Sequence, residues 1–460
     1  MPALRLLEVD VEERELRFRM PFRFGAATLE ACPQLVVRIR AEVDGAAASG
    51  VAAEFALPKW FDKAPALRES DNVAQLRRSL ALAVDVYRGG GREPSPFALH
   101  RTCAPEHRRR CEGEGLPPLV ASFGAALVDR ALIDAACRSA KLSFFDAVRS
   151  NLLGIDGSLT PELSGFDLEA FLAGLRPSAE IAARHTVGLL DPLTAADLRG
   201  PRPADPLPCT LEECVERYGN THFKLKLSGR ADADVDRLLR IAAVLDRLPE
   251  YRATLDGNEQ YKDADGVLAF WDLLEARPEL GRLRSAILFI EQPIARSVAL
   301  SAPVTALARK RPVEIDESDG TLDAFVLAKE LGYTGVSSKA CKGVYRSILN
   351  RARCAHWNGR EGTDRYFMSA EDLIVQAGVS LQQDLSLATI IGCAHGERNG
   401  HHYVNGLSGA PREEQTRILK AYPNLYHRGD DGIVRLSIHN GEIALQDLEA
   451  VGFGSASEFP

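Results

Sequence analysis

Five short segments between residues 222 and 342 each carry an ionisable side chain near the end of an apolar or β-branched run. They are residues 223–227 (FKLKL), 253–258 (ATLDGN), 287–293 (ILFIEQP), 313–318 (VEIDES) and 335–339 (GVSSK). The ionisable residues recur 23 to 35 residues apart. A parallel barrel of eight β/α units spans about 250 residues, or about 31 per unit, and carries its functional groups at the C-terminal ends of its strands. The spacing therefore predicts successive strands of such a barrel, with these side chains at its mouth.

Stretches with helical periodicity separate the five segments, and this alternation is typical of a parallel α/β sheet. We expect barrel helices at residues 211–217, 232–247, 266–276, 298–309, 322–331, 344–356 and 381–391. The first strand is expected at 185–190, a later one at 365–369 and the last at 401–404, where the sequence reads HHYV.

The N-terminal part has a different order of elements. Residues 4–18, 34–43 and 46–55 are predicted strands, and residues 71–88 and 118–150 carry helical periodicity. Strands followed by helices indicate an α+β domain. We therefore predict a (β/α)₈ barrel with an α+β capping domain. The expected divisions are a cap at 1–150, a connecting insert at 151–182, the barrel at 183–405 and a tail at 406–460 that returns to the cap.

Composition limits the possible partners and the location. The 460 residues carry a formal net charge of −8, which argues against bulk electrostatic binding to nucleic acid or to an anionic membrane. The apolar runs fall short of the ~18 residues that a membrane span needs. The N-terminus becomes acidic too early for a signal peptide. Nine cysteines are scattered without a Cys-x-x-Cys pair or an evident Cys/His ligand spacing, so neither disulfides nor a zinc site are suggested, and we expect a cytoplasmic protein.

The first of the five segments carries two lysines on one face. Lys224 and Lys226 are two residues apart, so both side chains point into the barrel near its mouth. Two neighbouring ammonium groups raise the free energy of the doubly charged state, which lowers the pKa of at least one of them. We expect a lysine that accepts a proton near neutral pH.

Three acids follow on three consecutive strands. Asp256, Glu291 and Asp316 should converge in an arc, and carboxylate oxygens suit Mg²⁺, which leaves coordination positions for water and substrate. Asn258 shares the face of Asp256 and is expected to hydrogen-bond a ligand or a carboxylate. Lys339, on the next strand, would flank the metal opposite the lysine pair. Such a site can remove the proton α to a substrate carboxylate, because a divalent cation stabilises the enediolate that forms.

In this order and at these spacings, the motifs resemble those of the enolase superfamily, specifically its muconate-lactonizing-enzyme-like, mandelate-racemase-related branch. The resemblance is carried by Lys-x-Lys at 224–226, Asp-x-Asn at 256–258, EQP at 291–293, DES at 316–318 and KACKG at 339–343. It implies Mg²⁺ held by Asp256, Glu291 and Asp316, acid/base catalysis by Lys226 and Lys339, and Lys224 beside the substrate carboxylate. It also implies a homo-oligomer and cap loops at residues 22–28 and 55–63 that close over a small-molecule carboxylate substrate. The glycine pair that often follows the second catalytic lysine of the family is replaced here by Gly343-Val344.

Four further residues are candidate substrate contacts, and each has a competing interpretation. Phe24 and Trp60 are expected to cover the substrate, unless they belong to the core of the cap. Glu371 follows a predicted strand, where a first-turn acid favoured by the helix dipole is equally expected. His401 would reach the mouth from the predicted last strand, and a packed or surface histidine is at least as common an outcome.

The predicted function is Mg²⁺-dependent abstraction of an α-proton, as in a racemase, epimerase or cycloisomerase. If the substrate has a leaving group at its β-position, the same enediolate eliminates, as in an acid-sugar dehydratase. Two further alternatives are a Schiff-base aldolase with one lysine as nucleophile and a non-catalytic metabolite-binding barrel. The sequence does not choose among these outcomes.

Overall fold

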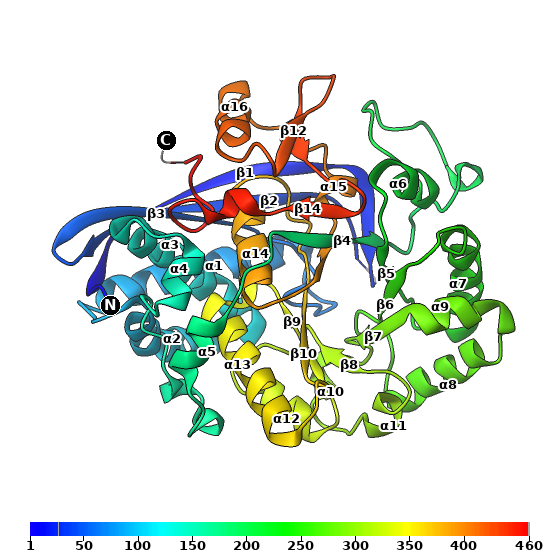
Figure 1. Cartoon of the computed structure of the whole chain (residues 1–460), viewed down its shortest axis with the longest axis horizontal. Helices are drawn as coiled ribbons and strands as arrows, with labels where there is room; N and C mark the ends of the chain where they lie inside the picture. Colours follow the sequence, from blue (N-terminus) through cyan, green and yellow to red (C-terminus); the bar gives the residue numbers. More distant parts are fainter. Residues whose placement is uncertain (26, 459–460) are drawn as a thin grey trace.

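The N-terminal part forms an antiparallel sheet that lies across the barrel (Figure 1). The computed structural model describes residues 1–25 and 27–458. Strands β1 (Leu4–Phe24), β2 (Ala27–Val43) and β3 (Ala46–Phe55) pair in the order β1-β2-β3. The expected cap loop at 22–28 is the tip of the long β1–β2 hairpin, apart from residue 26, which lies outside the described residues.

Four helices complete the cap. They are α1 (Glu69–Gly89), α2 (Pro96–Gly113), α3 (Pro118–Ala140) and α4 (Phe144–Arg149). Helix α3 is buried along almost its whole length and packs on β3. Gly50 permits this contact, because a Cβ atom at that position would lie 2.0 Å from the carbonyl oxygen of Ala131. The connecting insert contains two short 3₁₀ helices, η1 (Gly157–Leu159) and η2 (Pro161–Leu163), and helix α5 (Leu168–Gly174).

Eight parallel strands form a closed barrel, as expected from the sequence. In ring order they are β4 (Glu180–Val187), β5 (His222–Lys226), β6 (Arg252–Asp256), β7 (Ile287–Glu291), β8 (Val313–Ile315), β9 (Gly335–Ser338), β10 (Phe367–Ala370) and β11 (His395–Arg398). Strand β11 pairs with β4 and closes the ring. A short strand of the tail, β14 (Glu442–Ala444), adds to β4 in the antiparallel direction.

Helices cover the outside of the ring. They are α6 (Leu211–Tyr218), α7 (Ala231–Leu245), α8 (Ala264–Glu275), α9 (Gly281–Ala286), α10 (Arg296–Ala299), α11 (Thr305–Ala308), α12 (Ala324–Glu330), α13 (Val344–Glu361) and α14 (Val379–Ile390). Short 3₁₀ helices lie in the connections: η3 (Ala195–Asp197), η4 (Pro278–Leu280) and η5 (Ala340–Lys342). The helix expected at 298–309 is broken into α10 and α11, because Pro303 disfavours a helical conformation in the residue before it.

Two strand predictions need correction. The first barrel strand begins at Glu180, five residues before the expected start and ahead of the predicted domain division at residue 183. The last strand is β11, whereas the expected strand at 401–404 falls on helix α15 (Gly400–Tyr403). Strand β11 reads HGER, with its charged side chains buried in ion pairs, so it lacks the apolar alternation by which strands are predicted.

The C-terminal tail contacts both the cap and the barrel. It contains α16 (Arg412–Ala421), the hairpin of β12 (Tyr426–Arg428) and β13 (Val434–Leu436), β14, and η6 (Gln446–Glu449). Phe453 stacks on Phe144 of the cap helix α4, with 4.0 Å between ring centroids. One hydrophobic core accordingly includes residues of the cap, of β4, α13 and α14, and of the tail, and a second core fills the side of the barrel around β5 to β9.

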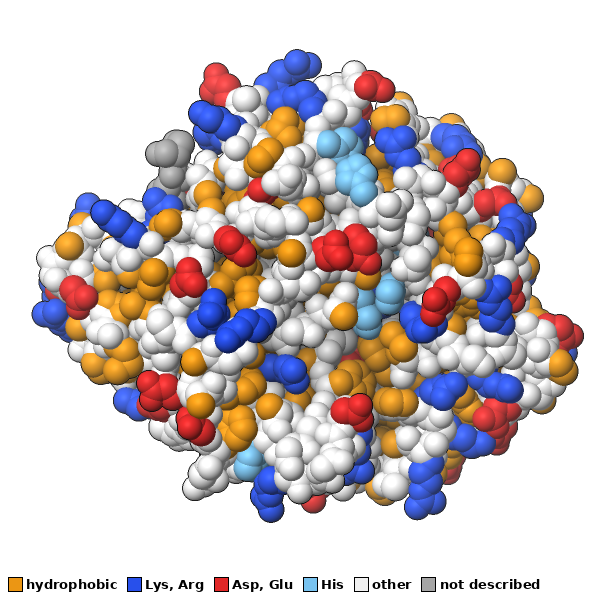
Figure 2. Space-filling model, viewed as in Figure 1, with side chains coloured by type: hydrophobic (Ala, Val, Ile, Leu, Met, Phe, Trp, Pro, Cys, Tyr) orange, Lys and Arg blue, Asp and Glu red, His pale blue; other side chains and the backbone are white. Residues whose placement is uncertain are grey.

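Among the described residues, no helix is long and apolar enough to cross a membrane. Figure 2 shows acidic and basic side chains interspersed over the face in view.

Candidate active site

A small pocket lies where the barrel mouth meets the cap. The barrel contributes Lys224, Lys226, Asp256, Asn258, Asp316, Lys339, Asp372, Leu373, Ile374, Glu397 and Asn399, and the cap contributes Phe22, Phe24, Leu57 and Trp60. Its free volume is about 20 Å³, close to the space of a single water molecule. The hairpin tip and the loop after β3 therefore close the mouth almost completely, and a substrate enters only if they move.

The two lysines of β5 point into the barrel, as their spacing predicts. Lys226 Nζ lies 2.6 Å from Asp256 Oδ2. Lys224 Nζ lies within 3.0 Å of four carboxylates, those of Asp256, Glu291, Glu371 and Glu397. Burial opposes the charge of Lys224, but these carboxylates outweigh burial and raise its pKa well above the ordinary value. The expected lowering of a pKa by lysine–lysine repulsion is therefore wrong for Lys224.

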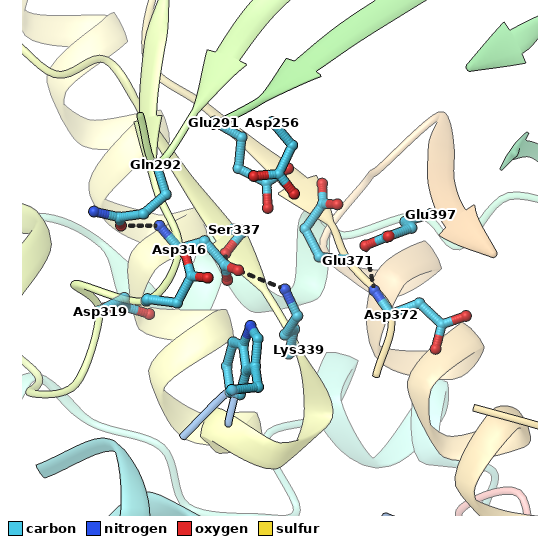
Figure 3. Close-up of polar contacts among 12 residues, drawn as sticks. Asp256, Glu291, Gln292, Asp316, Asp319, Ser337, Lys339, Glu371, Asp372 and Glu397 are labelled. Atoms are coloured by element: carbon cyan, nitrogen blue, oxygen red, sulfur yellow. Dashed lines mark hydrogen bonds and ion pairs between the residues drawn. The ribbon is translucent and has the colours of Figure 1, made fainter. Parts of the chain in front are cut away.

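The three predicted metal ligands lie at the C-terminal ends of consecutive strands. Asp256 is the last residue of β6, Glu291 is the last residue of β7, and Asp316 directly follows β8. Figure 3 shows the carboxylates of Asp256 and Glu291 turned toward each other, and Lys224 lies between them. Burial, and then the charges of Asp256 and Glu371, raise the pKa of Glu291 well above its ordinary value. Repulsion among buried acids of this kind is relieved by a bound cation.

Asp316 is held by basic groups. Its Oδ2 accepts a hydrogen bond of 2.7 Å from Lys339 Nζ, and its Oδ1 lies 3.2 Å from Lys342 Nζ and accepts from Ser337 Oγ. Burial opposes the charge, but the two lysines outweigh it, so the pKa of Asp316 lies well below its ordinary value. Lys339 Nζ also lies 4.8 Å from the ring centre of Trp60, within the range of a cation–π contact.

A second group of carboxylates lies deeper in the barrel. One oxygen each from Glu291, Glu314 and Glu371 lies within 4.8 Å of the others. Glu314 is two residues before Asp316 and therefore points inward one layer below it, where Ser369 Oγ donates to it. Glu314 is absent from the pocket lining. Burial and the charge of Glu371 raise the pKa of Glu314 well above its ordinary value, which favours the neutral acid.

The candidate substrate contacts divide into two groups. Phe24, Trp60 and Asn258 line the pocket, and the Asn258 side chain donates to Glu317 Oε1 at 3.3 Å. Glu371 points into the barrel below the pocket, where it pairs with Lys224 and Arg184. It is therefore placed to hold the lysine.

The structure places His401 outside the barrel. The side chain lies behind β4, with its Nε2 atom 3.1 Å from His185 Nδ1 and its ring against Tyr218. His401 is on α15, which follows β11, and it does not line the pocket.

Two further acids line the pocket: Glu397, which was not among the predicted site residues, and Asp372, which follows the same predicted strand as Glu371 and has the same two interpretations. Glu397 accepts hydrogen bonds from Lys224 and Thr186, and Asp372 accepts from the backbone N–H of Val375 and Asn399. Burial raises the pKa of Asp372 to about 7. Glu397 lies on the strand that lacks apolar alternation, so the only available signal was an acid at the interval of one β/α unit.

Lys226 and Lys339 lie on opposite sides of the pocket. Lys226 ends β5 and Lys339 follows β9, and these strands are four steps apart in a ring of eight. Each lysine is paired with one acid of the predicted metal set, Lys226 with Asp256 and Lys339 with Asp316. A ligand held by the acids would therefore have an ammonium group on each face.

Known structures with this architecture cover nearly the whole chain. The 2-chloromuconate cycloisomerase of Rhodococcus opacus 1CP aligns over 98% of this chain and 96% of its own, with a TM-score of 0.61 and 16% identity. The dipeptide epimerase of Enterococcus faecalis V583, in complex with Mg and L-Leu-L-Tyr, aligns over 98% and 99%, with a TM-score of 0.62 and 14% identity. The chain has the fold of these proteins. An enolase from Bradyrhizobium, in complex with magnesium and mandelic acid, aligns over 100% of this chain and 98% of its own, with a TM-score of 0.60 and 14% identity.

The similarity lies in the structure. No protein-family model and no curated protein matches the sequence. At these identities the comparison confirms the expected barrel with its capping domain.

Proposed function

We propose that this protein is an enzyme of the enolase superfamily that removes and returns the proton α to a substrate carboxylate. The observation that carries the proposal is the placement of Lys226 and Lys339 four strands apart around the ring, each paired with one acid of a three-acid set. Two lysines on opposite faces of one carbon can exchange its proton, because the neutral amine of one removes the proton and the ammonium group of the other returns one from the opposite side. This arrangement favours a racemase, epimerase or cycloisomerase.

The acids fit a divalent cation. Asp256 and Glu291 share one ammonium group, and the pKa of Glu291 is raised because it is buried and because like charges surround it. Oxygen donors of this kind suit Mg²⁺, and two structures of the same fold are described as complexes with magnesium. Asp256, Glu291 and Asp316 would hold the ion, which would neutralise the negative charge that develops on the substrate carboxylate.

The residues of the chain then have separate tasks. Lys224, fixed by Glu371 and Glu397, presents a permanent positive charge to the substrate carboxylate. The pKa of Lys339 is raised chiefly because the charge of Asp316 outweighs the opposing effect of burial. Any cation that neutralises Asp316 removes this effect, so the lysine becomes a better proton acceptor when the site is loaded. The cap excludes water, which strengthens each of these electrostatic contacts.

The pocket lining favours an apolar substituent on the substrate. Every cap residue that lines the pocket is apolar, namely Phe22, Phe24, Leu57 and Trp60, and Leu373 and Ile374 add to this surface from the barrel. The lysines all come from the barrel. A hydroxyl group placed against this apolar surface would be buried without a partner, which is unfavourable, and the polar lining residues Asn258, Asp372 and Asn399 all come from the barrel side. We therefore propose a monocarboxylate with an aryl or branched alkyl group as substrate, which favours isomerisation over acid-sugar dehydration.

The test is deuterium exchange at the α-carbon in D₂O with Mg²⁺. Aryl and alkyl hydroxy acids, N-acyl amino acids, dipeptides and acid sugars are screened by NMR, with and without EDTA. We expect exchange that needs Mg²⁺ and is lost in Lys226→Ala and Lys339→Ala but kept in Lys262→Ala, an exposed lysine. Turnover of a good substrate that survives EDTA would contradict the metal assignment. Trapping of a carbonyl substrate by borohydride would favour the aldolase instead.

A further inference from the structure

A cluster of histidine and cysteine side chains lies behind the barrel wall, away from the pocket. His185 is on β4 between Arg184 and Thr186, whose side chains point into the barrel toward Glu371 and Glu397. The side chain of His185 therefore points outward. There it meets Cys214 of α6 and His402 of α15, and one donor atom of each of the three residues lies within 4.8 Å of the other two.

The rings of His185 and His402 have polar neighbours at their nitrogen atoms. His402 Nδ1 lies 3.4 Å from Cys214 Sγ, and its other nitrogen, Nε2, lies 3.9 Å from a carboxylate oxygen of Asp191. His185 Nδ1 lies 3.1 Å from Nε2 of His401. Histidines that bind metals typically have one ring nitrogen on the ion and the other held by a neighbouring polar group.

His401 gives a second, independent indication of a missing partner. It is 9% exposed, and its Nδ1 atom has no hydrogen-bond partner among the described residues. Buried polar atoms without a partner are uncommon and indicate an absent water or ion. The ring of His401 lies 5.2 Å from that of His185 and faces it through Nε2, so the orphaned Nδ1 atom lies beside the cluster.

A cavity lies beside the cluster. His401 and Tyr218 line a cavity of about 730 Å³ between α6, α15 and the β12–β13 hairpin. Tyr218 is one helical turn after Cys214 on α6 and contacts His401. The cavity therefore extends as far as His401 and Tyr218, whereas His185, Cys214 and His402 are buried behind these two residues and do not line it.

From this geometry, we propose that His185, Cys214 and His402 form a binding site for a thiophilic divalent cation such as Zn²⁺, separate from the carboxylates at the barrel mouth. Two imidazoles and one thiolate are a common zinc ligand set, and a fourth position remains for a water molecule. The Cys214 thiol loses its proton to solvent as the ion binds. Asp191 acts as a positioning residue through His402 Nε2.

The site would join three segments that are far apart in the sequence. His185 belongs to the first barrel strand, Cys214 to the helix that follows it, and His402 to the segment after the last strand. An ion bound to all three would connect the first barrel strand with the segment after the last strand, at the point where the ring closes. Because the ion binds only the folded protein, it would stabilise the folded state.

Cobalt(II) provides a direct test. Chelator-treated protein is titrated with Co²⁺ in the presence of Mg²⁺, and the thiolate-to-cobalt charge-transfer band is followed in the near ultraviolet. We expect one equivalent to produce the band, and Cys214→Ala to abolish it. Cys354→Ala, which removes another buried cysteine, should keep it. The barrel mouth gives no such band, because its donors are oxygen atoms, so Asp316→Asn should also retain it.

Zinc binding supplies the second readout. Zn²⁺ should raise the thermal midpoint of the wild type and of Cys354→Ala, but not that of Cys214→Ala. Asp191→Asn should weaken Co²⁺ binding by about 10- to 100-fold, the usual effect of losing a carboxylate behind a histidine ligand. A wild type without the band, or a band that persists in Cys214→Ala, would overturn the proposal. Neither result bears on proton abstraction at the mouth, which is measured by α-carbon exchange.

Discussion

At the scale of single residues, the barrel interior offers two overlapping sets of carboxylates, and only one of them opens to the pocket. Asp256 and Asp316 line the pocket, whereas Glu314 lies one layer below and has a pKa raised by burial. Glu291 belongs to both sets. Of the three predicted ligands, Asp256 and Asp316 are therefore the two that face the pocket, whereas Glu291, like Glu314, does not line it.

The two sets are separated by their effects on Mg²⁺ affinity. Asp316→Asn should weaken Mg²⁺ binding by at least about 100-fold, because even residues behind the ligands contribute 10- to 100-fold. Glu314→Gln should leave the affinity nearly unchanged. Isothermal titration of both variants checks this, with circular dichroism to confirm that each is folded. The reverse order of effects would place the ion in the deeper set.

A buried carboxyl in the cap makes stability depend on pH. Burial raises the pKa of Asp134 to about 6, although Ser455 Oγ and the N–H groups of Phe453 and Val51 donate to it. The folded-state pKa is above the unfolded value near 3.8, so the folded state binds more protons between these values. The stability from this group is therefore complete below about pH 4 and is lost as the pH rises toward 6.

Asp134→Asn removes this titration. We expect its free energy of unfolding, relative to wild type, to improve by about 3 kcal/mol between pH 4 and pH 7, since each unit of pKa shift corresponds to about 1.4 kcal/mol. Urea unfolding at several pH values measures the difference. The exposed Asp10→Asn should show no such trend. A difference between Asp134→Asn and wild type that is constant with pH would contradict the assignment.

At the scale of elements, the side chain of Arg296 links the barrel to the cap loop that contains Trp60. Its guanidinium donates to the backbone oxygens of Trp60 and Phe61, each at 2.8 Å, and pairs with Glu259. Lys63 adds ion pairs to Glu259 and Glu317. These contacts hold the closed form of a loop that has to open for substrate.

Arg296→Ala should open this loop more often. Hydrogen bonds to charged groups contribute about 1.5–3 kcal/mol, so losing two of them should raise the open population at least about tenfold. Limited trypsin digestion at Lys59 or Lys63 reports that population. Arg277→Ala, at an exposed site, should be cut at the wild-type rate. Equal cleavage of the Arg296 variant would mean that other contacts hold the loop.

The strands that the sequence predicted best are those in which apolar residues precede the charged residue at the end of the strand. Strands β5, β6 and β7 end where expected, because buried apolar residues precede Lys226, Asp256 and Glu291. The sequence did not predict strand β11, because the side chains that it buries are charged and form ion pairs, so no alternation of apolar and polar residues is present. The histidine and cysteine cluster was also missed, since its members are 29 and 188 residues apart and only closure of the ring brings them together.

At the scale of the whole molecule, the cap and the barrel share one hydrophobic core. That core joins β1 to β3 and α3 with β4, α13, α14 and the tail. Phe453 is buried where these parts meet, stacked on Phe144, while its carbonyl oxygen accepts a hydrogen bond from Gln383 of α14. Two parts with a continuous core are expected to unfold together, even though separate domains commonly unfold in steps.

Phe453→Ala tests this coupling. Truncation of a buried phenylalanine destabilises a protein by about 3–5 kcal/mol, and here the loss should appear equally in both parts. In a Trp60→Phe background, which removes the one tryptophan of the cap, a fluorescent label on the cap and the intrinsic fluorescence of Trp271 and Trp357 in the barrel should report the same, shifted transition. Leu327→Ala, at an exposed leucine, should change stability by no more than about 0.5 kcal/mol. If the cap signal alone shifted while the barrel signal stayed in place, the two parts would be independent, and the closed pocket between them would depend only on the loops that meet there.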